Sequence, residues 1–256
     1  MAKVISIANQ KGGVGKTTTA VNLSACVAQK GKKVLLIDID PQGNATSGLG
    51  VKAEADKSIY NVLVEDLDMK DTIKQTMIKK LFVCPANINL AGAEIELVSM
   101  VSRENRLKDA IEEIRDDYDY IFIDCPPSLG LITLNSFTAS DSVLVPIQCE
   151  YYALEGLGQL INTIKLVQKH LNKDLEIEGV ILTMFDSRTN LSTEVASEVE
   201  KYFGNKVFQT VIPRNIRLSE APSHGVPISI YDPNSKGAEK YKKLAKELIK
   251  INEKGE

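Results

Sequence analysis

Short apolar runs alternate with helical patterns along nearly the whole chain. Runs typical of buried β-strands occupy residues 4–8, 34–37, 81–84, 120–123, 142–145, 179–183 and 207–211. Between them, apolar residues recur at intervals of three and four, for example Leu107, Ile111 and Ile114, as in amphipathic helices. Residues 51–80 are more polar and weakly patterned, and we expect short peripheral helices there. The alternation predicts an α/β fold: a doubly wound, mostly parallel sheet with helices on both faces and ligands at the carboxyl ends of its strands.

Composition narrows the class of protein. No repeat, linker or low-complexity segment interrupts the alternation, so we expect a single domain over residues 1–256. A hydrophobic content of 43% with mixed charges is typical of a globular protein. The net charge of −3 excludes a global basic field, so any nucleic-acid binding would need a local patch. The four cysteines form no C-x-x-C pair, and no signal peptide or membrane span is evident, so a cytoplasmic protein with reduced thiols is expected.

A glycine loop joins the first predicted strand to a helical pattern at residues 20–30. Residues 9–19 read NQKGGVGKTTT. Glycines let the backbone curl around an anion with its N–H groups pointing inward, and a helix N-terminus adds partial positive charge. In this context we expect Lys16 to bridge the β- and γ-phosphates of ATP and the Thr17 hydroxyl to ligate Mg²⁺.

The loop departs from the ordinary phosphate-loop pattern in two places. The first glycine of G-x-x-x-x-G-K-[ST] would fall at position 10, where this chain has Gln10. A second lysine, Lys11, stands at the loop entrance. Its ammonium is placed to reach a phosphate held by a second subunit; the alternative is a solvated lysine in a loop.

Two aspartate motifs follow predicted strands. In residues 37–44 (IDIDPQGN), strand periodicity puts Asp38 and Asp40 on one face, with Asp40 at the strand's carboxyl end. Asp40 could orient the attacking water or hold the water shell of the metal. The alternative, a turn carboxylate that caps the next helix, applies more strongly to Asp38. In residues 121–127 (IFIDCPP), Asp124 ends an apolar strand and is expected to hold the metal through water.

Together, residues 9–17, 38–44 and 124–127 resemble the deviant-Walker partition ATPases of the ParA family, most closely the chromosomal Soj type. Residues 148–156, 184–190, 211–217 and 219–225 agree with the same pattern, so the similarity runs from residue 3 to about residue 248. Because the chain starts directly at its first strand, we expect no N-terminal DNA-binding extension of the kind found in plasmid-type relatives.

The resemblance implies an ATP-driven switch. ATP would join two copies face to face, with each Lys11 reaching the nucleotide of the partner. This homodimer would bind double-stranded DNA without sequence preference. A centromere-binding partner of the ParB (Spo0J-like) type would stimulate slow hydrolysis, usually through a basic N-terminal tail, and release the dimer. The expected setting is the cytoplasm and nucleoid, with a chromosome or a plasmid as cargo.

The resemblance also implies roles for individual residues. The catalytic residues are Lys11, Lys16 and Asp40, and the metal-holding residues are Thr17, Asp40 and Asp124. The residues expected to contact nucleotide are Lys11, Gly12, Gly13, Val14, Gly15, Lys16, Thr17, Thr18, Glu150, Met184, Pro213, Arg214 and Asn215. Those expected to contact DNA are Arg188 and Arg217, with Arg214 and Lys206 as lesser candidates. For each basic residue, a solvated side chain or a surface ion pair is the alternative.

Three rival functions share this fold. A membrane-cycling ATPase of the MinD type would use an amphipathic tail, and residues 240–250 are basic and amphipathic. Their apolar side is modest, so we expect them to pack on the sheet, with no membrane partner. A metabolic enzyme that phosphorylates or amidates a small molecule would need a substrate segment, and none is evident. An iron–sulfur ATPase would need paired cysteines, which the spacing does not provide.

Overall fold

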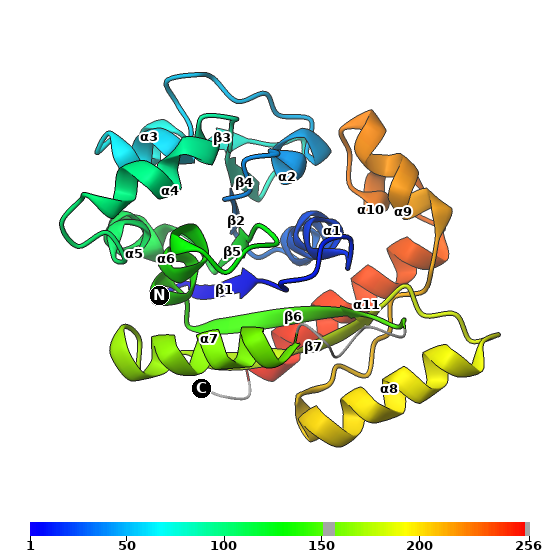
Figure 1. Ribbon diagram of the computed structural model, residues 1–256. Coiled ribbons are helices and arrows are strands. Elements are labelled where there is room, and N and C mark those ends of the chain that lie inside the picture. Colours follow the sequence, from blue (N-terminus) through cyan, green and yellow to red (C-terminus); the bar gives the residue numbers. More distant parts are fainter. Residues whose placement is uncertain (151–156, 254–256) are drawn as a thin grey trace.

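The computed structural model describes residues 1–150 and 157–253. Its centre is a seven-stranded sheet in the order β3-β4-β2-β5-β1-β6-β7 (Figure 1). The strands are β1 (Lys3–Ile7), β2 (Val34–Asp38), β3 (Lys74–Gln75), β4 (Leu81–Cys84), β5 (Tyr120–Asp124), β6 (Ser142–Gln148) and β7 (Glu176–Thr183). All pairings are parallel except that of β3 with β4, so the expected doubly wound, mostly parallel sheet is confirmed.

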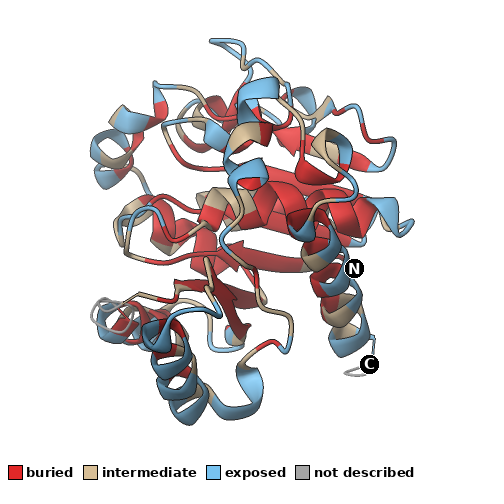
Figure 2. Cartoon of the chain, turned by 90° about the vertical axis from the view of Figure 1, so that its right-hand side faces the viewer, coloured by how far each residue is buried: buried red, intermediate tan, exposed pale blue. Residues whose placement is uncertain are grey.

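Helices cover both faces of this sheet (Figures 1 and 2). The α-helices are α1 (Lys16–Gln29), α2 (Asn44–Gly48), α3 (Ile59–Val64), α4 (Leu90–Val98), α5 (Arg106–Glu112), α6 (Leu131–Ala139), α7 (Leu157–His170), α8 (Asn190–Phe203), α9 (Ile216–Glu220), α10 (Ile228–Tyr231) and α11 (Lys236–Asn252). Short 3₁₀ turns are η1 (Met69–Asp71), η2 (Arg115–Asp117), η3 (Gly204–Lys206) and η4 (Ala221–His224). Of the helices in residues 1–150 and 157–253, none combines the length and the hydropathy that a membrane-spanning helix needs.

Strand residues alternate between two apolar cores, one on each side of the sheet. Ile5 and Ile7 of β1 join the core under α1 and α11, whereas Val4 joins the core under α4 to α7. Helix α11 buries Tyr241 and Leu248 against α1, as the packing interpretation of residues 240–250 predicted. Its apolar side is therefore used within the fold.

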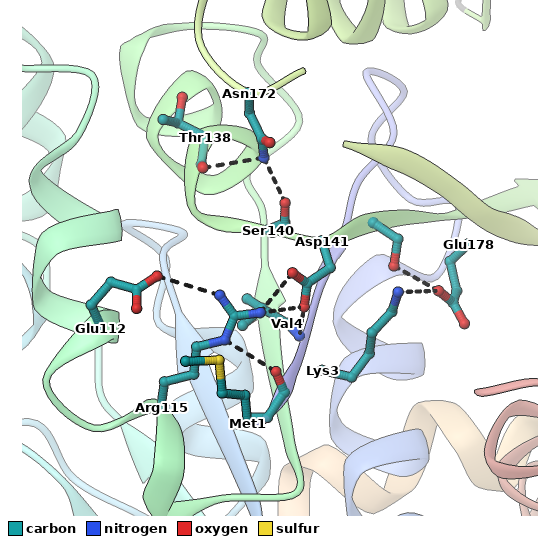
Figure 3. A network of polar contacts seen from close by, with 12 residues as sticks. Met1, Lys3, Val4, Glu112, Arg115, Thr138, Ser140, Asp141, Asn172 and Glu178 are labelled. Atoms are coloured by element: carbon teal, nitrogen blue, oxygen red, sulfur yellow. Dashed lines mark hydrogen bonds and ion pairs between the residues drawn. The ribbon is translucent and has the colours of Figure 1, made fainter. Parts of the chain in front are cut away.

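One polar network fixes the amino-terminal ends of the strands (Figure 3). Asp141, just before β6, accepts a hydrogen bond from the N–H of Val4 in β1 at 2.8 Å. The Arg115 guanidinium donates to both oxygens of the same carboxylate, at 2.6 and 2.8 Å. Because β1 leads directly into the glycine loop, this network helps to set where the loop leaves the sheet.

The predicted strand at residues 207–211 is wrong. Val207 forms a single bridge with Val180, and Phe208 and Ile212 donate to β7, but no ladder connects these points. The N–H groups of Gln209 and Thr210 donate instead to the carboxylate of Glu247 in α11, at 2.7 and 3.1 Å. A tertiary contact thus replaces the strand pairing.

The expectation of only short helices at residues 51–80 is wrong in part. Helix α3 and the turn η1 lie there, but Lys74 and Gln75 also form β3, which pairs antiparallel with Val83 and Phe82 of β4. Two polar residues at a sheet edge give no apolar run, which is why the pattern did not predict this strand.

Candidate nucleotide site

The glycine loop lies between β1 and α1 and leaves room beside its backbone. Gly13 (φ 73°) and Gly15 (φ 90°) adopt left-handed conformations that favour glycine. Side chains at Gly12 or Gly13 would meet no atom within 4 Å, so the space beside them is open. Within the described chain, the N–H groups of residues 12–18 form no hydrogen bonds. These donors at a helix N-terminus make a cradle that suits a phosphate.

The Lys16 ammonium is buried at the base of this cradle. The residue is 6% exposed, and its Nζ donates to the backbone carbonyl of Lys11 at 3.1 Å. Burial lowers the pKa of Lys16, while the nearby carboxylates of Asp124 and Asp40 oppose that shift. A bound phosphate would supply the negative charge that a desolvated ammonium needs.

Asp124 ends β5 beside Lys16 and Thr17 and is 0% exposed. Neither carboxylate oxygen has a hydrogen-bond partner in the described chain. Burial, and then the charge of Asp38, raises the pKa of Asp124 well above its usual range, and the nearby Thr17 hydroxyl partly offsets this. A buried carboxylate with unused lone pairs next to a hydroxyl fits the oxygen ligands of Mg²⁺.

The donor set is small. No group of three or more His, Cys, Asp and Glu side chains in residues 1–150 and 157–253 is arranged to hold a metal. Thr17 and Asp124 alone would therefore leave most of the coordination positions of Mg²⁺ to phosphate oxygens and water. This is the usual situation for Mg²⁺ at nucleotide sites.

Asp38 and Asp40 have different environments. Asp38 accepts hydrogen bonds from the N–H and hydroxyl of Thr46, at 2.8 and 2.7 Å, and from the N–H of Asp40 at 3.2 Å. Burial raises the pKa of Asp38 to about 6. Asp38 therefore holds the turn and the start of α2, in line with the capping alternative. Among the described residues, Asp40 accepts a hydrogen bond only from Gln42 N–H, at 2.9 Å, and it is 9% exposed at the edge of the site.

A cavity of about 490 Å³ opens beside the loop. Six residues expected to contact nucleotide line it: Gly15, Thr18, Met184, Pro213, Arg214 and Asn215. Sequence reasoning missed Thr183, which ends β7 and donates from its hydroxyl to the Val14 carbonyl at 2.8 Å. It also missed Tyr241, a core residue of α11 that reaches the cavity wall. The position of Thr183 at a strand end was a weak indication that it would lie near the ligand, and nothing in the sequence indicated that Tyr241 would.

Lys11 and Glu150 lie at the rim of the site. Lys11 is partly exposed, its N–H is held by Asn9 Oδ1 at 3.0 Å, and its ammonium forms no ion pair within the described residues. Glu150 pairs with Arg214 at 2.8 Å. The rest of the 148–156 motif, residues 151–156, lies outside the described chain.

Each basic residue expected to contact DNA is ion-paired. The pairs are Arg188 with Asp186, Arg214 with Glu150, Arg217 with Glu220, and Lys206 with Glu176. The Arg188 hydrogen bonds lower the pKa of Asp186, and the nearby Arg214 lowers it further, so Arg214 lies close to the Arg188–Asp186 pair. Lys206 is different, because Glu176 begins β7 at the end of the sheet opposite the glycine loop. The structure thus groups Arg188 with Arg214 and separates Lys206 from them.

The glycine loop after β1, the buried Lys16 and the buried Asp124 at the end of the neighbouring strand β5 define a P-loop nucleotide-binding protein of the α/β class.

Comparisons with known proteins agree with this class. The sequence model of a family described as "AAA domain" matches residues 2–177. The chain is 67% identical over 249 residues to the sporulation initiation inhibitor protein Soj of Bacillus subtilis, covering 97% of this chain and 98% of that protein. It is 54% identical to the chromosome partitioning protein ParA of Myxococcus xanthus, covering 98% of this chain and 89% of that protein. A solved structure of cobyrinic acid a,c-diamide synthase from Mycobacterium smegmatis, with bound ATP analogue and magnesium, has a TM-score of 0.87 at 38% identity and covers 100% of this chain and 98% of that chain.

The chain therefore belongs to the Soj/ParA family of chromosome-partitioning ATPases. The resemblance inferred from the motifs is confirmed, and so is the fold class.

Proposed function

We propose that this protein is an ATP-dependent DNA-partitioning switch. Mg-ATP binds in the glycine cradle and joins two copies face to face, and the dimer binds double-stranded DNA without sequence preference. A ParB-type centromere-binding partner stimulates slow hydrolysis and releases the dimer from the nucleoid, so that a chromosome or a plasmid is segregated. The observation that carries the ATPase part is the orphaned carboxylate of Asp124 beside the open cradle and the buried Lys16.

The chemistry is assigned to four side chains. Lys16 neutralises the β- and γ-phosphates, and the unbonded N–H groups of residues 12–18 orient them. Thr17 and Asp124 hold Mg²⁺, which supplies positive charge to the phosphate oxygens. Asp40 lies at the edge of the site, where its carboxylate accepts a hydrogen bond from Gln42 N–H, and it orients the attacking water. The 490 Å³ cavity lined by Met184 and residues 213–215 takes the base and ribose.

The dimer is proposed from the rim of the site. Lys11 is partly exposed and has no ion-pair partner among the described residues, and its backbone is fixed by hydrogen bonds with Asn9 and Lys16. A lysine whose backbone is held and whose ammonium is unpaired suits a phosphate bound by a second copy. Glu150, at the carboxyl end of β6, lies on the same rim and would meet the partner's nucleotide.

Binding to DNA requires that the exposed arginines exchange their partners. Arg188 is 86% and Arg217 52% exposed at the side chain, and exposed ion pairs of this kind contribute little to stability. Replacing the carboxylate partner of each arginine by a DNA phosphate therefore costs little free energy, and dimerisation doubles the number of available arginines. Phosphate contacts of this kind ignore sequence and weaken steeply with salt.

A binding assay tests the switch. Biolayer interferometry with a double-stranded DNA of arbitrary sequence should show at least tenfold tighter binding with ATP than with ADP. Replacing both Arg188 and Arg217 by Ala should remove the difference, whereas Lys206→Ala, at the far end of the sheet, should change it little. Equal DNA affinity with ATP and ADP contradicts the proposal.

Two rival functions remain testable. The name of the Mycobacterium smegmatis neighbour suggests amidation of a corrinoid, but at 38% identity it is more distant than the 67% identical Soj. A coupled assay with cobyrinic acid and glutamine should show no product. Membrane cycling is disfavoured because the apolar side of α11 is buried in the fold. Sedimentation with anionic vesicles should therefore leave the protein in the supernatant with ATP or ADP.

A further inference from the structure

The side chain of Asn9 lies at the point where the glycine loop leaves the sheet. It is 5% exposed, and it hydrogen-bonds to two backbone groups. Its Nδ2 donates to the carbonyl of Pro146 in β6 at 2.7 Å, and its Oδ1 accepts from the N–H of Lys11 at 3.0 Å. Because a carbonyl only accepts and an N–H only donates, these two partners determine the orientation of the amide. Asn9 therefore joins the loop to the neighbouring strand.

The hydrogen bond to Pro146 extends a ladder that the backbone cannot extend. The pairing of β1 with β6 ends where the N–H of Ala8 donates to the carbonyl of Leu144 at 3.1 Å (Figure 1). In a parallel ladder residue 146 would supply the next N–H, but a proline has none. The carbonyl of Pro146 is buried, and the Asn9 amide donates to it in place of a backbone N–H. The main chain can therefore turn into the loop without leaving this carbonyl unpaired.

The hydrogen bond to Lys11 holds the backbone of the lysine that is proposed to reach the phosphates of a second copy. Lys11 follows Asn9 by two residues, the spacing at which an asparagine side chain closes a turn on its own backbone. The carbonyl of Lys11 accepts separately from the buried Lys16 ammonium at 3.1 Å. Both polar groups of the Lys11 backbone are therefore held, and only its side chain has a choice of direction.

The same asparagine connects Lys11 to the strand that carries Glu150. Pro146 lies four residues before Glu150, and β6 continues to Gln148. Lys11 and Glu150 are the two residues proposed to meet the nucleotide of the partner. A shift of the loop along β6 would change the distance between them. The hydrogen bond from Asn9 to Pro146 opposes such a shift.

We infer that Asn9 is a positioning residue for the ATP-bound dimer. It fixes the backbone of Lys11, and with it the origin of the side chain, before the second copy binds. Less conformational freedom is then lost when the two copies join, so the dimer is tighter. Asn9 contacts no phosphate or metal and acts through Lys11. The inference rests on the proposed function, because it needs a dimer in which Lys11 binds the nucleotide of the second copy.

The test compares dimer formation with nucleotide binding by a single chain. Sedimentation equilibrium of the hydrolysis-blocked Asp40→Ala chain with Mg-ATP gives the Kd of the dimer, and titration with fluorescent Mg-ADP gives the affinity of one cradle. Adding Asn9→Ala to this chain should weaken the dimer at least about tenfold, because the Lys11 backbone is no longer held in advance. The affinity for Mg-ADP should stay within about threefold, because Lys16 and the N–H groups of the loop remain.

The matched control is Asn172→Ala, in the same Asp40→Ala chain. The Asn172 amide donates to backbone carbonyls near the start of β6, at the end of the sheet opposite the glycine loop (Figure 3). The distances are 3.2 Å to Thr138 and 2.7 Å to Ser140. This variant also removes an asparagine that binds backbone groups, and the Kd of the dimer should not change.

Asn9→Ser is a second variant, and it supplies the same comparison if Asn9→Ala does not fold. A serine hydroxyl accepts more weakly from the N–H two residues further on, and it is too short to reach Pro146 as well. The dimer should therefore be weakened, but less than in Asn9→Ala. A loss as large as that of Asn9→Ala would overturn the inference, because the hydrogen bond to Lys11 would not be the cause.

Three other outcomes contradict the inference. An unchanged dimer Kd in Asn9→Ala refutes the inference alone, since the Asp40→Ala parent still forms the proposed dimer. Loss of Mg-ADP binding in Asn9→Ala also refutes it, because Asn9 would then support the cradle rather than Lys11. An equal loss of the dimer in Asn172→Ala would show a general effect of destabilisation. If the Asp40→Ala parent itself stays a single chain when saturated with Mg-ATP, the proposed function fails, and the inference fails with it.

Discussion

The buried carboxylate of Asp124 leads to a prediction about stability as well as binding. The side chain is 0% exposed, and within the described chain neither oxygen accepts a hydrogen bond, so its ionised form is unfavourable in the fold. The substitution Asp124→Asn keeps the shape and removes the charge. Without nucleotide, we expect this variant to be more stable than the wild type at pH 7.

The size of the gain is bounded by proton linkage. Burial raises the pKa of Asp124 well above its ordinary value of 3.8, so the fold favours the protonated carboxyl. Keeping that proton at pH 7 costs at most about 4 kcal/mol, because each pKa unit corresponds to about 1.36 kcal/mol. At roughly 2–4 °C per kcal/mol for a chain of this size, each kcal/mol of this linkage cost that Asp124→Asn removes should raise the melting temperature by that amount.

The pH dependence has a definite sign. Above about pH 4 the unfolded chain has lost the Asp124 proton while the folded chain retains it, so wild-type stability falls there as pH rises. The advantage of Asp124→Asn should therefore be absent near pH 4 and grow toward pH 7. Differential scanning fluorimetry from pH 4 to 8 measures it, with the exposed Asp117→Asn as the control.

Mg-ADP should reverse the order of stability of the wild type and Asp124→Asn. Mg-ADP at 100 times its Kd should stabilise the wild type by about 2.7 kcal/mol. The Asp124→Asn variant lacks the carboxylate that holds the metal and should gain much less. A variant no more stable than the wild type without nucleotide, or equally stabilised by Mg-ADP, would refute the reasoning.

Four further predictions concern the loop and its neighbours. Lys16→Ala should weaken ATP binding about 100-fold or more by calorimetry, because the phosphates lose a desolvated counter-charge; near-normal affinity would contradict this. Lys11→Ala should bind ATP as tightly as the wild type yet stay monomeric in light scattering. Thr183→Val loses the 2.8 Å hydrogen bond to Val14 and should weaken ATP binding about threefold to tenfold, whereas Thr163→Val on α7 should not. The pKa of Asp38 is raised from 3.8 to about 6, so the melting temperature of the wild type should fall relative to that of Asp38→Asn as pH rises through this window, and parallel pH curves would exclude the shift.

The sequence predicted the parts of the fold that depend on local pattern. The runs at residues 34–37, 81–84 and 120–123 became β2, β4 and β5, because strands covered by helices on both faces are apolar along their whole length and can be recognised from that run alone. The strand predicted at residues 207–211 does not form, because a contact between residues far apart in the sequence replaces it. Glu247 lies far along the chain and takes two N–H groups that a strand would have used, and no local pattern encodes such a contact.

The site likewise contains residues that the local sequence pattern predicts and residues that only tertiary packing brings to it. The loop from Gly12 to Thr18 was predictable because glycine spacing and the adjoining strand and helix determine its geometry. Thr183 and Tyr241 reach the cavity from β7 and α11, elements distant in sequence, and their approach depends on tertiary packing. The sequence also did not predict that Arg188 and Lys206 lie at different ends of the sheet, because an exposed arginine or lysine has the same local sequence pattern at either end.

Light scattering of the hydrolysis-blocked variant Asp40→Ala tests the central claim most directly. With Mg-ATP the mass should be about 56 kDa, twice the 28.1 kDa of one chain, and with ADP or no nucleotide it should stay at 28.1 kDa. A variant that binds Mg-ATP to saturation and still has the mass of a single chain would contradict the account.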